Sequence, residues 1–233
     1  MQKKDPTFSE ITRLISDLWD TLTEPQREAV ADNLSIRKYK KNEIIYAEEE
    51  IPTCIYCVLA GKAKIYRDGV GGRSQIMRMA KPVEYFGYRA YFANGRYVTT
   101  AAAFEPSTIC SIPISIIGDI VKENNKLAVF FIRQLAADLG QADERTVNLT
   151  QKHIRGRLAE SLLFLKESYG LEEDGATISI YLSREDLASL SNMTTSNAIR
   201  TLSNFAGEHI IAIDGRKIKI INEEALRKVS KTG

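Results

Sequence analysis

Hydrophobic positions near the N-terminus of the chain repeat with a helical period. The apolar residues on this spacing are Ile11, Leu14, Ile15 and Leu18. A second helix start follows, with Thr23 as a candidate N-cap and Pro25 in the first turn, where a missing N–H costs little. Residues 1 to about 34 are therefore expected to be helical.

The hydrophobic period then shortens, and from Ile36 to Ile112 short β-rich segments alternate with turn residues such as Asn94-Gly95. The segments read EIIYA, CIYCVL, AKIYR, SQIMRMA, YVTTAAAF and TICSI. Several short strands at this spacing are typical of an antiparallel barrel or jelly roll. We expect a β-roll in this part of the chain.

Beyond Pro113 the hydrophobic period lengthens to that of a coiled coil. Apolar or small residues follow one another at alternating intervals of four and three, at Ala128, Ile132, Leu135, Leu139, Ala142, Thr146 and Leu149. A helix from Lys122 to Gln151 would be about 45 Å long, which is too long for a small roll to cover. We expect this seam to pair with its copy in a parallel homodimer. The alternative is that the seam packs on its own roll.

A further helix is expected to start near His153, and a polar loop, GLEEDG, follows at residues 170–175. The apolar face of this helix carries Ile154, Leu158, Leu162 and Leu165. Beyond the loop, Ser183 and Asp186 form a variant of the capping box and start a short helix that carries Leu187 and Leu190.

A second short helix is expected directly after a turn at Asn192-Met193, with Thr194 as its N-cap. Its apolar residues are Ala198, Ile199, Leu202 and Phe205. The segments IIAI and IKII then flank Asp214-Gly215, which is a strong hairpin signal. A helix, a short turn, a helix and a hairpin together describe a winged helix.

A winged helix places the N-terminal side chains of its second helix against base edges in the DNA major groove. The candidate base contacts are Thr195, Ser196 and Arg200, and the capping residue Thr194 is a further candidate DNA contact. Arg200 is the only charged residue between Thr194 and Phe205, and its guanidinium can fork onto a guanine. The candidate phosphate contacts are Ser183, Arg184 and the wing residues Arg216, Lys217 and Lys219.

The charge of this region is balanced, with 11 basic and 11 acidic residues from His153 onward, so the domain is not broadly basic. The acids gather in the loop at residues 170–175 and near the C-terminus, and the expected DNA face keeps a local positive excess. Nonspecific affinity should therefore be modest. The alternative is a helical hairpin that binds no DNA.

Three passages resemble the Crp/Fnr family of bacterial transcription regulators: GKAKIYRDG, NLT…IRGRLAESLLFL and SREDLASLSNMTTSNAIRTLSNF. The resemblance covers nearly the whole chain. It implies an α+β protein with an antiparallel β-roll sensor domain at residues 1–121, a dimerisation helix and hinge at 122–152, and a winged helix-turn-helix domain at 153–233. It also implies a homodimer that binds double-stranded DNA at a near-palindromic operator and acts with RNA polymerase.

Members of this family that bind cyclic AMP carry a cassette of glycine, glutamate, a short helix and arginine. Gly87 fits the glycine, but Tyr88 stands at the glutamate position. The arginine position falls on Tyr97, or on Arg96 if the alignment shifts by one residue. The small hydroxyl residues of the dimer helix are replaced by Ala142 and Asp143. We therefore expect no response to cyclic AMP in the usual way, because the nucleotide hydroxyls would go unpaired.

A different effector remains an alternative. Arg89 and Arg96 could form an anion site for another small anionic or nucleotide ligand. The aromatic residues that could line a flat apolar pocket are Tyr85, Phe86, Tyr88, Tyr91, Phe92 and Tyr97. Aromatic residues at this density are more often part of a core, so the other interpretation is an absent or unknown input.

The cysteines and histidines indicate no metal or cofactor. Cys54 and Cys57 lie at i and i+3 of an expected strand, so their thiols point to opposite faces, and Cys110 has no second pair to complete a metal site. The family's iron–sulfur sensors need an N-terminal cysteine cluster, and its haem sensors need ligands in the roll. No cysteine precedes Cys54, and both histidines, His153 and His209, lie outside the roll.

Enzyme activity is not expected, because the sequence contains no Walker loop, G-x-S-x-G or H-E-x-x-H motif. Two non-regulator interpretations remain: a cyclic-nucleotide-like binding module of an enzyme, and a winged helix used only for protein contacts. No apolar run is long enough for a membrane span, and the N-terminus lacks the apolar segment of a secretory signal. We expect a cytoplasmic protein.

Overall fold

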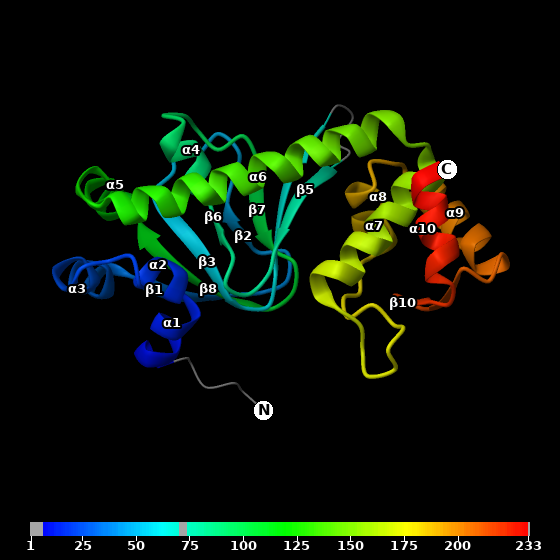
Figure 1. Ribbon diagram of the computed structural model, residues 1–233, viewed down its shortest axis with the longest axis horizontal. Coiled ribbons are helices and arrows are strands. Elements are labelled where there is room, and N and C mark those ends of the chain that lie inside the picture. Colours follow the sequence, from blue (N-terminus) through cyan, green and yellow to red (C-terminus); the bar gives the residue numbers. More distant parts are fainter. Residues whose placement is uncertain (1–6, 70–73, 233) are drawn as a thin grey trace. The chain divides into compact units, whose positions relative to one another are not determined.

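A computed structural model describes residues 7–69 and 74–232 (Figure 1). The chain divides into two compact units, Met1–Arg67 with Met77–Leu139, and Asp68–Ile76 with Gly140–Gly233. Among the described residues, no helix is both long and apolar enough to cross a membrane.

Three short helices open the described chain, as expected from the helical spacing there. They are α1 (Phe8–Leu14), α2 (Ser16–Trp19) and α3 (Glu24–Asn33). The expected cap of α3 is part of a capping box, in which the Thr23 amide donates to the Gln26 side chain at 3.1 Å. The buried side chains Ile15 and Leu18 lie in the same apolar cluster as strand residues of the roll.

The expected β-roll is confirmed as two four-stranded sheets, in the orders β1-β8-β3-β6 and β2-β7-β4-β5. The strands are β1 (Ser35–Tyr39), β2 (Ile44–Tyr46), β3 (Cys54–Ala60), β4 (Ala63–Asp68), β5 (Ser74–Ala80), β6 (Tyr85–Phe86), β7 (Thr100–Ala103) and β8 (Ser107–Pro113). Strand β3 lies between β8 and β6 and pairs antiparallel with both.

The two faces of β3 belong to different cores, which confirms that the thiols of Cys54 and Cys57 diverge. Cys57 is buried in the cluster that includes the N-terminal helices, whereas Cys54 packs against the aromatic cluster inside the roll. Cys57 lies directly opposite Cys110 of β8, and both thiols are free and buried. Burial raises the pKa of the Cys110 thiol to about 12, which is the state of an inert, hydrophobic cysteine.

Helix α5 (Ile114–Glu123) and helix α6 (Asn125–Gln151) follow the roll. The sequence predicted one helix from Lys122, but Lys122 is the penultimate residue of α5, and the backbone at Asn124 is extended. Helix α6 has 27 residues and is therefore about 40 Å long.

The Asn124 side chain causes this break. Its oxygen accepts hydrogen bonds from the amides of Lys126 and Leu127 at 3.0 and 3.2 Å, and so caps α6. Its Nδ2 donates to the Thr21 carbonyl at 2.9 Å and to Gln26 Oε1 at 2.7 Å. One buried amide therefore starts α6 and fastens it to the turn between α2 and α3.

The second unit contains the expected helices and hairpin, and one more helix at the C-terminal end (Figure 1). Its elements are α7 (Ile154–Tyr169), α8 (Arg184–Leu190), α9 (Thr195–Gly207), β9 (Ile211–Asp214), β10 (Lys217–Ile220) and α10 (Glu223–Thr232). Asp214 pairs with Lys217, so the hairpin loop is Gly215-Arg216, and Gly215 has φ +56°. Helix α10 was not predicted, and it packs on α7 with Leu226 fully buried.

Replacing Asn124 with alanine should lower the free energy of unfolding of the first unit by about 2 kcal/mol, because it removes a helix cap and leaves buried groups unpaired. Trp19, the only tryptophan in the chain, lies in α2 and reports urea unfolding of this unit by fluorescence. Asn125→Ala is the matched control, because its side chain is exposed. Equal stability of the Asn124 variant and the native chain would contradict the capping role.

Candidate nucleic-acid interface and effector site

Helices α8 and α9 are each started by the residue that the sequence indicated. The Ser183 hydroxyl accepts a hydrogen bond from the Asp186 amide at 3.0 Å, and the Thr194 hydroxyl accepts one from the Asn197 amide at 3.2 Å. Between the helices, Asn192 has φ +49°, a left-handed conformation that asparagine tolerates. These local interactions set the direction in which α9 leaves the turn.

One face of α9 is packed and the other is open to solvent. The buried residues are Ala198, Thr201, Leu202 and Phe205. The candidate DNA contacts Thr194, Thr195, Ser196 and Arg200 are all exposed. Arg200 donates to the side-chain oxygen of Asn197 at 3.0 Å, so this guanidinium is held along the helix surface. The start of α9 thus offers a polar, solvent-facing edge.

Ile199, one of the apolar residues expected on this helix, does not lie in its packed face. Its side chain is 48% exposed, and the buried position belongs to Thr201 instead. The packed positions follow the helical period from Ala198 to Phe205, and Ile199 lies about 100° away from Ala198 around the helix axis.

Two candidate phosphate contacts already have partners within the unit. The Ser183 hydroxyl donates to Asp186 Oδ2 at 2.7 Å, in addition to its capping bond. Arg184 Nη2 donates to the Gly215 carbonyl at 2.8 Å and so connects α8 to the wing turn. Among the described residues, Arg184 Nη1 is a buried nitrogen with no hydrogen-bond partner.

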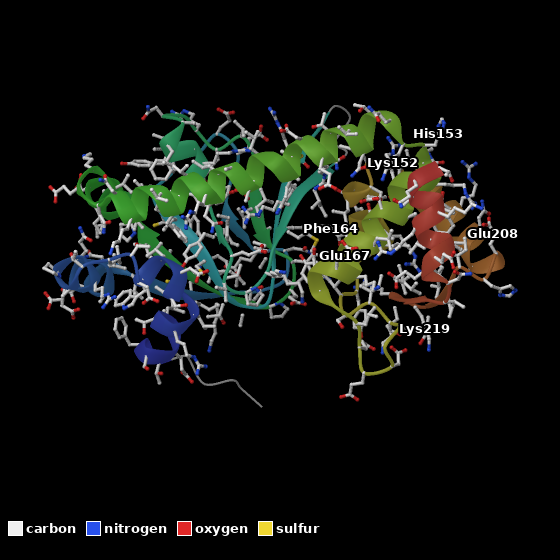
Figure 2. All side chains as sticks on the ribbon, in the orientation of Figure 1. Lys152, His153, Phe164, Glu167, Glu208 and Lys219 are labelled. Atoms are coloured by element: carbon white, nitrogen blue, oxygen red, sulfur yellow. The ribbon has the colours of Figure 1, made fainter. Side chains whose placement is uncertain are left out.

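The wing lysines lie beside the acidic loop, which overturns the expectation that the loop acids leave the wing positive. Lys217 Nζ is 3.6 Å from Glu172, and Lys219 Nζ is 3.3 Å from Asp174. The segment after the loop runs alongside β10, where the Ile178 amide donates to the Ile218 carbonyl at 3.0 Å. This hydrogen bond holds the acidic loop close to the wing lysines. Lys219 is labelled on β10 in Figure 2, and Arg216 is exposed in the turn.

The loop carboxylate Asp174 is strongly held in its charged form. Hydrogen bonds from the Thr177 and Ala176 amides hold the pKa of the Asp174 carboxyl well below its usual range. A DNA phosphate that approaches Lys219 therefore meets a lysine already paired with a full negative charge.

The joint between α6 and α7 lies at Lys152 and His153, where the sequence placed a hinge (Figure 2). His153 is the N-cap residue of α7 and has an extended backbone. Lys152 Nζ lies 2.8 Å from Glu160 on α7 and 3.2 Å from the Ser230 hydroxyl on α10. The joint is thus braced by an ion pair within the second unit.

An exposed ion pair connects the start of α7 to the end of α9. The two terminal nitrogens of Arg155 donate to the two carboxylate oxygens of Glu208 at 2.8 and 2.7 Å. The same guanidinium lies 5.0 Å from the ring centre of Phe205, the buried anchor of α9. A bidentate contact fixes the relative orientation of these two side chains, and it connects α7 directly to the residue that ends α9.

In the first unit, the candidate cassette is built around Gly87. This residue is the N-cap of α4 (Tyr88–Phe92) and has φ +86°. A Cβ atom here would lie 2.8 Å from the Tyr56 ring, so both the conformation and the space require glycine. The assignment of Gly87 to the cassette glycine therefore fits the local geometry.

The side chain of Tyr88 is buried and hydrogen-bonded. It is 1% exposed, and its hydroxyl donates to Asp138 Oδ2 on α6 at 2.7 Å. Arg78 Nη1 donates to the same oxygen at 3.1 Å. Burial, reinforced by the hydrogen bond to Asp138, raises the pKa of the Tyr88 phenol, so it remains a donor at neutral pH.

Sequence reasoning missed Arg78 and Asp138. Arg78 reads as an ordinary strand residue, and Asp138 precedes seam residue Leu139 in a helical pattern. Burial opposes the charge of Arg78, but Asp138 and neighbouring groups more than offset this, and the pKa of the guanidinium is raised. Together, Arg78, Tyr88 and Asp138 join the roll to α6 through a polar cluster.

The remaining cassette residues are divided between the buried core and the surface. Tyr97 is buried and stacks on Tyr46, with ring centres 3.8 Å apart. Arg96 is exposed and donates to the Glu49 carbonyl at 2.7 Å, and Arg89 is also exposed. The aromatic residues Tyr85, Phe86, Tyr88 and Tyr97 are buried core, as the second interpretation expected, and Tyr91 and Phe92 are half-buried.

The expected seam of α6 is open over much of its length. Ile132 and Leu139 are 62% and 63% exposed. Ala142, Asp143 and Thr146 are also exposed, whereas Ala128, Leu135 and Leu149 are half-buried. A second side of α6, about 100° away around the helix axis, buries Leu127 and Phe131 in the first unit. The seam therefore does not pack wholly on its own roll.

No three histidine, cysteine, aspartate or glutamate side chains gather as a metal site within the described residues.

Two family models match the chain: the cyclic nucleotide-binding domain over residues 36–124, and the Crp-like helix-turn-helix domain over residues 156–229.

Curated relatives match most of the chain. The CRP-like cAMP-activated global transcriptional regulator of Mycobacterium tuberculosis is 23% identical over 201 residues, covering 86% of this chain and 90% of the relative. The nitrogen fixation regulation protein FixK of Bradyrhizobium diazoefficiens is 27% identical, covering 75% of this chain and 73% of the relative. The structure of FixK2 from Bradyrhizobium japonicum shares the fold, with a TM-score of 0.76 at 22% identity, covering 86% of this chain and 98% of that one.

Proposed function

This chain belongs to the Crp/Fnr family of transcription regulators, and we propose that it binds a near-palindromic operator as a homodimer. The observation that carries the proposal is the distribution of buried and exposed residues on α9. One face of the helix is buried, and its first turns present exposed polar residues and Arg200. A helix with this distribution suits the major groove. In this proposal Thr195, Ser196 and Arg200 face bases.

The wing supplies the phosphate contacts in this proposal. Arg216, Lys217 and Lys219 are exposed and lie on the hairpin that follows α9. Lys217 and Lys219 must exchange Glu172 and Asp174 for phosphates, so their net contribution to affinity is reduced. Binding to unrelated DNA should accordingly be weak, and operator recognition should depend mainly on α9.

Dimerisation through α6 is proposed because the exposed seam has coiled-coil spacing. Two exposed branched residues, Ile132 and Leu139, lie seven residues apart on one face of a 27-residue helix. Pairing this face with its copy would remove both from water at about 25 cal/mol per Å² of apolar surface. It would also present two α9 helices, which must lie about 34 Å apart to enter successive major grooves.

We propose that cyclic AMP does not control this regulator in the usual way. The residue at the ribose-binding position is the buried Tyr88, whose hydroxyl is committed to Asp138. A nucleotide would have to displace that contact and would find no carboxylate acceptor for its ribose from residue 88. A different anionic effector, held by the exposed Arg89 and Arg96, is the second candidate. With either candidate, the proposed regulator acts in the cytoplasm together with RNA polymerase.

Arg200→Ala should weaken operator binding by about 1 to 3 kcal/mol, because it removes the side chain proposed to fork onto a guanine. A gel shift with the protein's own upstream DNA first tests whether the chain binds DNA. Fluorescence anisotropy with an operator selected from random duplexes then measures the operator affinity of the native chain and of the variant. Unchanged operator affinity of the Arg200 variant would refute the placement of α9 in the groove.

Lys217→Ala provides the contrast, because a phosphate contact carries no sequence information. This variant should weaken operator and scrambled duplexes alike, and it should flatten the slope of log affinity against log salt by up to about 1. A loss confined to the operator would reassign Lys217 to base recognition.

Leu139→Glu should convert the protein to a monomer, because it places charges face to face across the seam. Analytical ultracentrifugation at micromolar concentration, with and without operator, measures the state of assembly. Ala137→Glu is the matched control: Ala137 is exposed on the same helix but lies outside the seam positions. A native chain that stays monomeric with operator present would overturn the homodimer.

Titration of a nucleotide panel by calorimetry should show no saturable heat with cyclic AMP, because residue 88 supplies no carboxylate to accept from the ribose hydroxyl and the hydroxyl of Tyr88 is committed to Asp138. The cAMP-activated relative from Mycobacterium tuberculosis serves as the positive control for the assay. Tight binding of cyclic AMP by this chain would show that the cassette is still functional.

A further inference from the structure

Ile199 is an exposed apolar side chain on the polar face of α9. It is 48% exposed, although the neighbouring Ala198 is completely buried. Ile199 is the fifth residue of the helix and directly precedes Arg200. The side chain therefore lies in the part of α9 that the proposed function brings to the base edges.

The position of Ile199 around the helix axis agrees with this placement. At about 100° per residue, Ser196, Ile199, Arg200 and Ser203 fall within an arc of about 100°. All four are exposed, and the buried residues lie on the opposite arc. Ile199 is thus flanked on the open face by residues that can form hydrogen bonds.

The chemistry of isoleucine limits what this side chain can read. It neither donates nor accepts hydrogen bonds, so it gains nothing from a base edge that offers only polar atoms. The major groove displays one apolar group, the C5-methyl group of thymine. A β-branched side chain in a helix is also nearly restricted to one χ1 rotamer, so little side-chain entropy is lost when Ile199 packs against that methyl group.

We propose that Ile199 determines specificity by packing against the C5-methyl group of a thymine in the base pair next to the guanine read by Arg200. The inference rests on the proposed function, namely that α9 enters the major groove. It adds a position at which the operator is read by apolar contact alone.

The expected size of the effect follows from the burial of one methyl group. Burial of a methylene-sized group contributes about 0.8 kcal/mol, which corresponds to about a fourfold change in affinity. A dimer on a palindromic site makes the contact twice, so loss of both methyl groups should weaken binding about fifteenfold.

The test removes the methyl group without changing any hydrogen bond. Each thymine of the operator selected by the native protein is replaced in turn by deoxyuridine, symmetrically in both half-sites, and affinity is measured by fluorescence anisotropy. We expect one position per half-site at which uracil costs about fifteenfold. The same substitution should have almost no effect on the Ile199→Ala variant, which already lacks the apolar partner.

Ile221→Ala is the matched control, because Ile221 is 52% exposed in the same unit but lies beyond the hairpin rather than on α9. This variant should keep the full response to uracil. Thermal unfolding of both variants checks that the fold is retained, and the scan with the native protein tests the proposal independently of any variant.

The outcomes separate this inference from the function on which it rests. Failure to select any operator would remove the proposed function itself. Specific binding in which no uracil position weakens affinity, or in which the loss persists in Ile199→Ala, would overturn the role of Ile199 and leave DNA binding intact.

Discussion

The two-sided nature of α6 is the constraint on which the rest of the structure depends. One face of the helix must bury Leu127 and Phe131 in the first unit, and the other carries the open seam with Ile132 and Leu139. Asn124 fixes where the helix starts, and Asp138 fixes its rotation through the hydroxyl of Tyr88. With both set, Ile132 and Leu139 are open to solvent, while the seam residue Leu135 packs against the core of the first unit.

The second unit shows how a movement of its helices could reach α9. Lys152 braces the joint between α6 and α7, and the bidentate pair of Arg155 with Glu208 connects α7 to the end of α9. The pair fixes the relative orientation of these two side chains, so it is a direct contact between α7 and the end of α9. In the proposed function, an input that changes the joint between α6 and α7 would therefore reach α9 through α7 and this ion pair.

The sequence predicted most of the fold because its patterns are local. The capping residues Ser183 and Thr194, and the alternation of short strands, depend on neighbours within a few positions. The polar cluster of Arg78, Tyr88 and Asp138 could not be predicted, because its members are about 60 and 50 residues apart and no periodicity connects them. The sequence analysis named Ile199 as an apolar residue of its helix, and only the packing of α9 shows that its side chain is exposed.

The pairing of wing and loop changes how discrimination should arise. If Lys217 and Lys219 were unpaired, nonspecific attraction would be strong and would act on every sequence equally. Their pairing with Glu172 and Asp174 lowers that shared background while leaving the exposed face of α9 unaffected. In the proposed function, wing contacts act on operator and background DNA alike, so the ratio of the two affinities, which decides occupancy among many competing sites, depends on the contacts of α9.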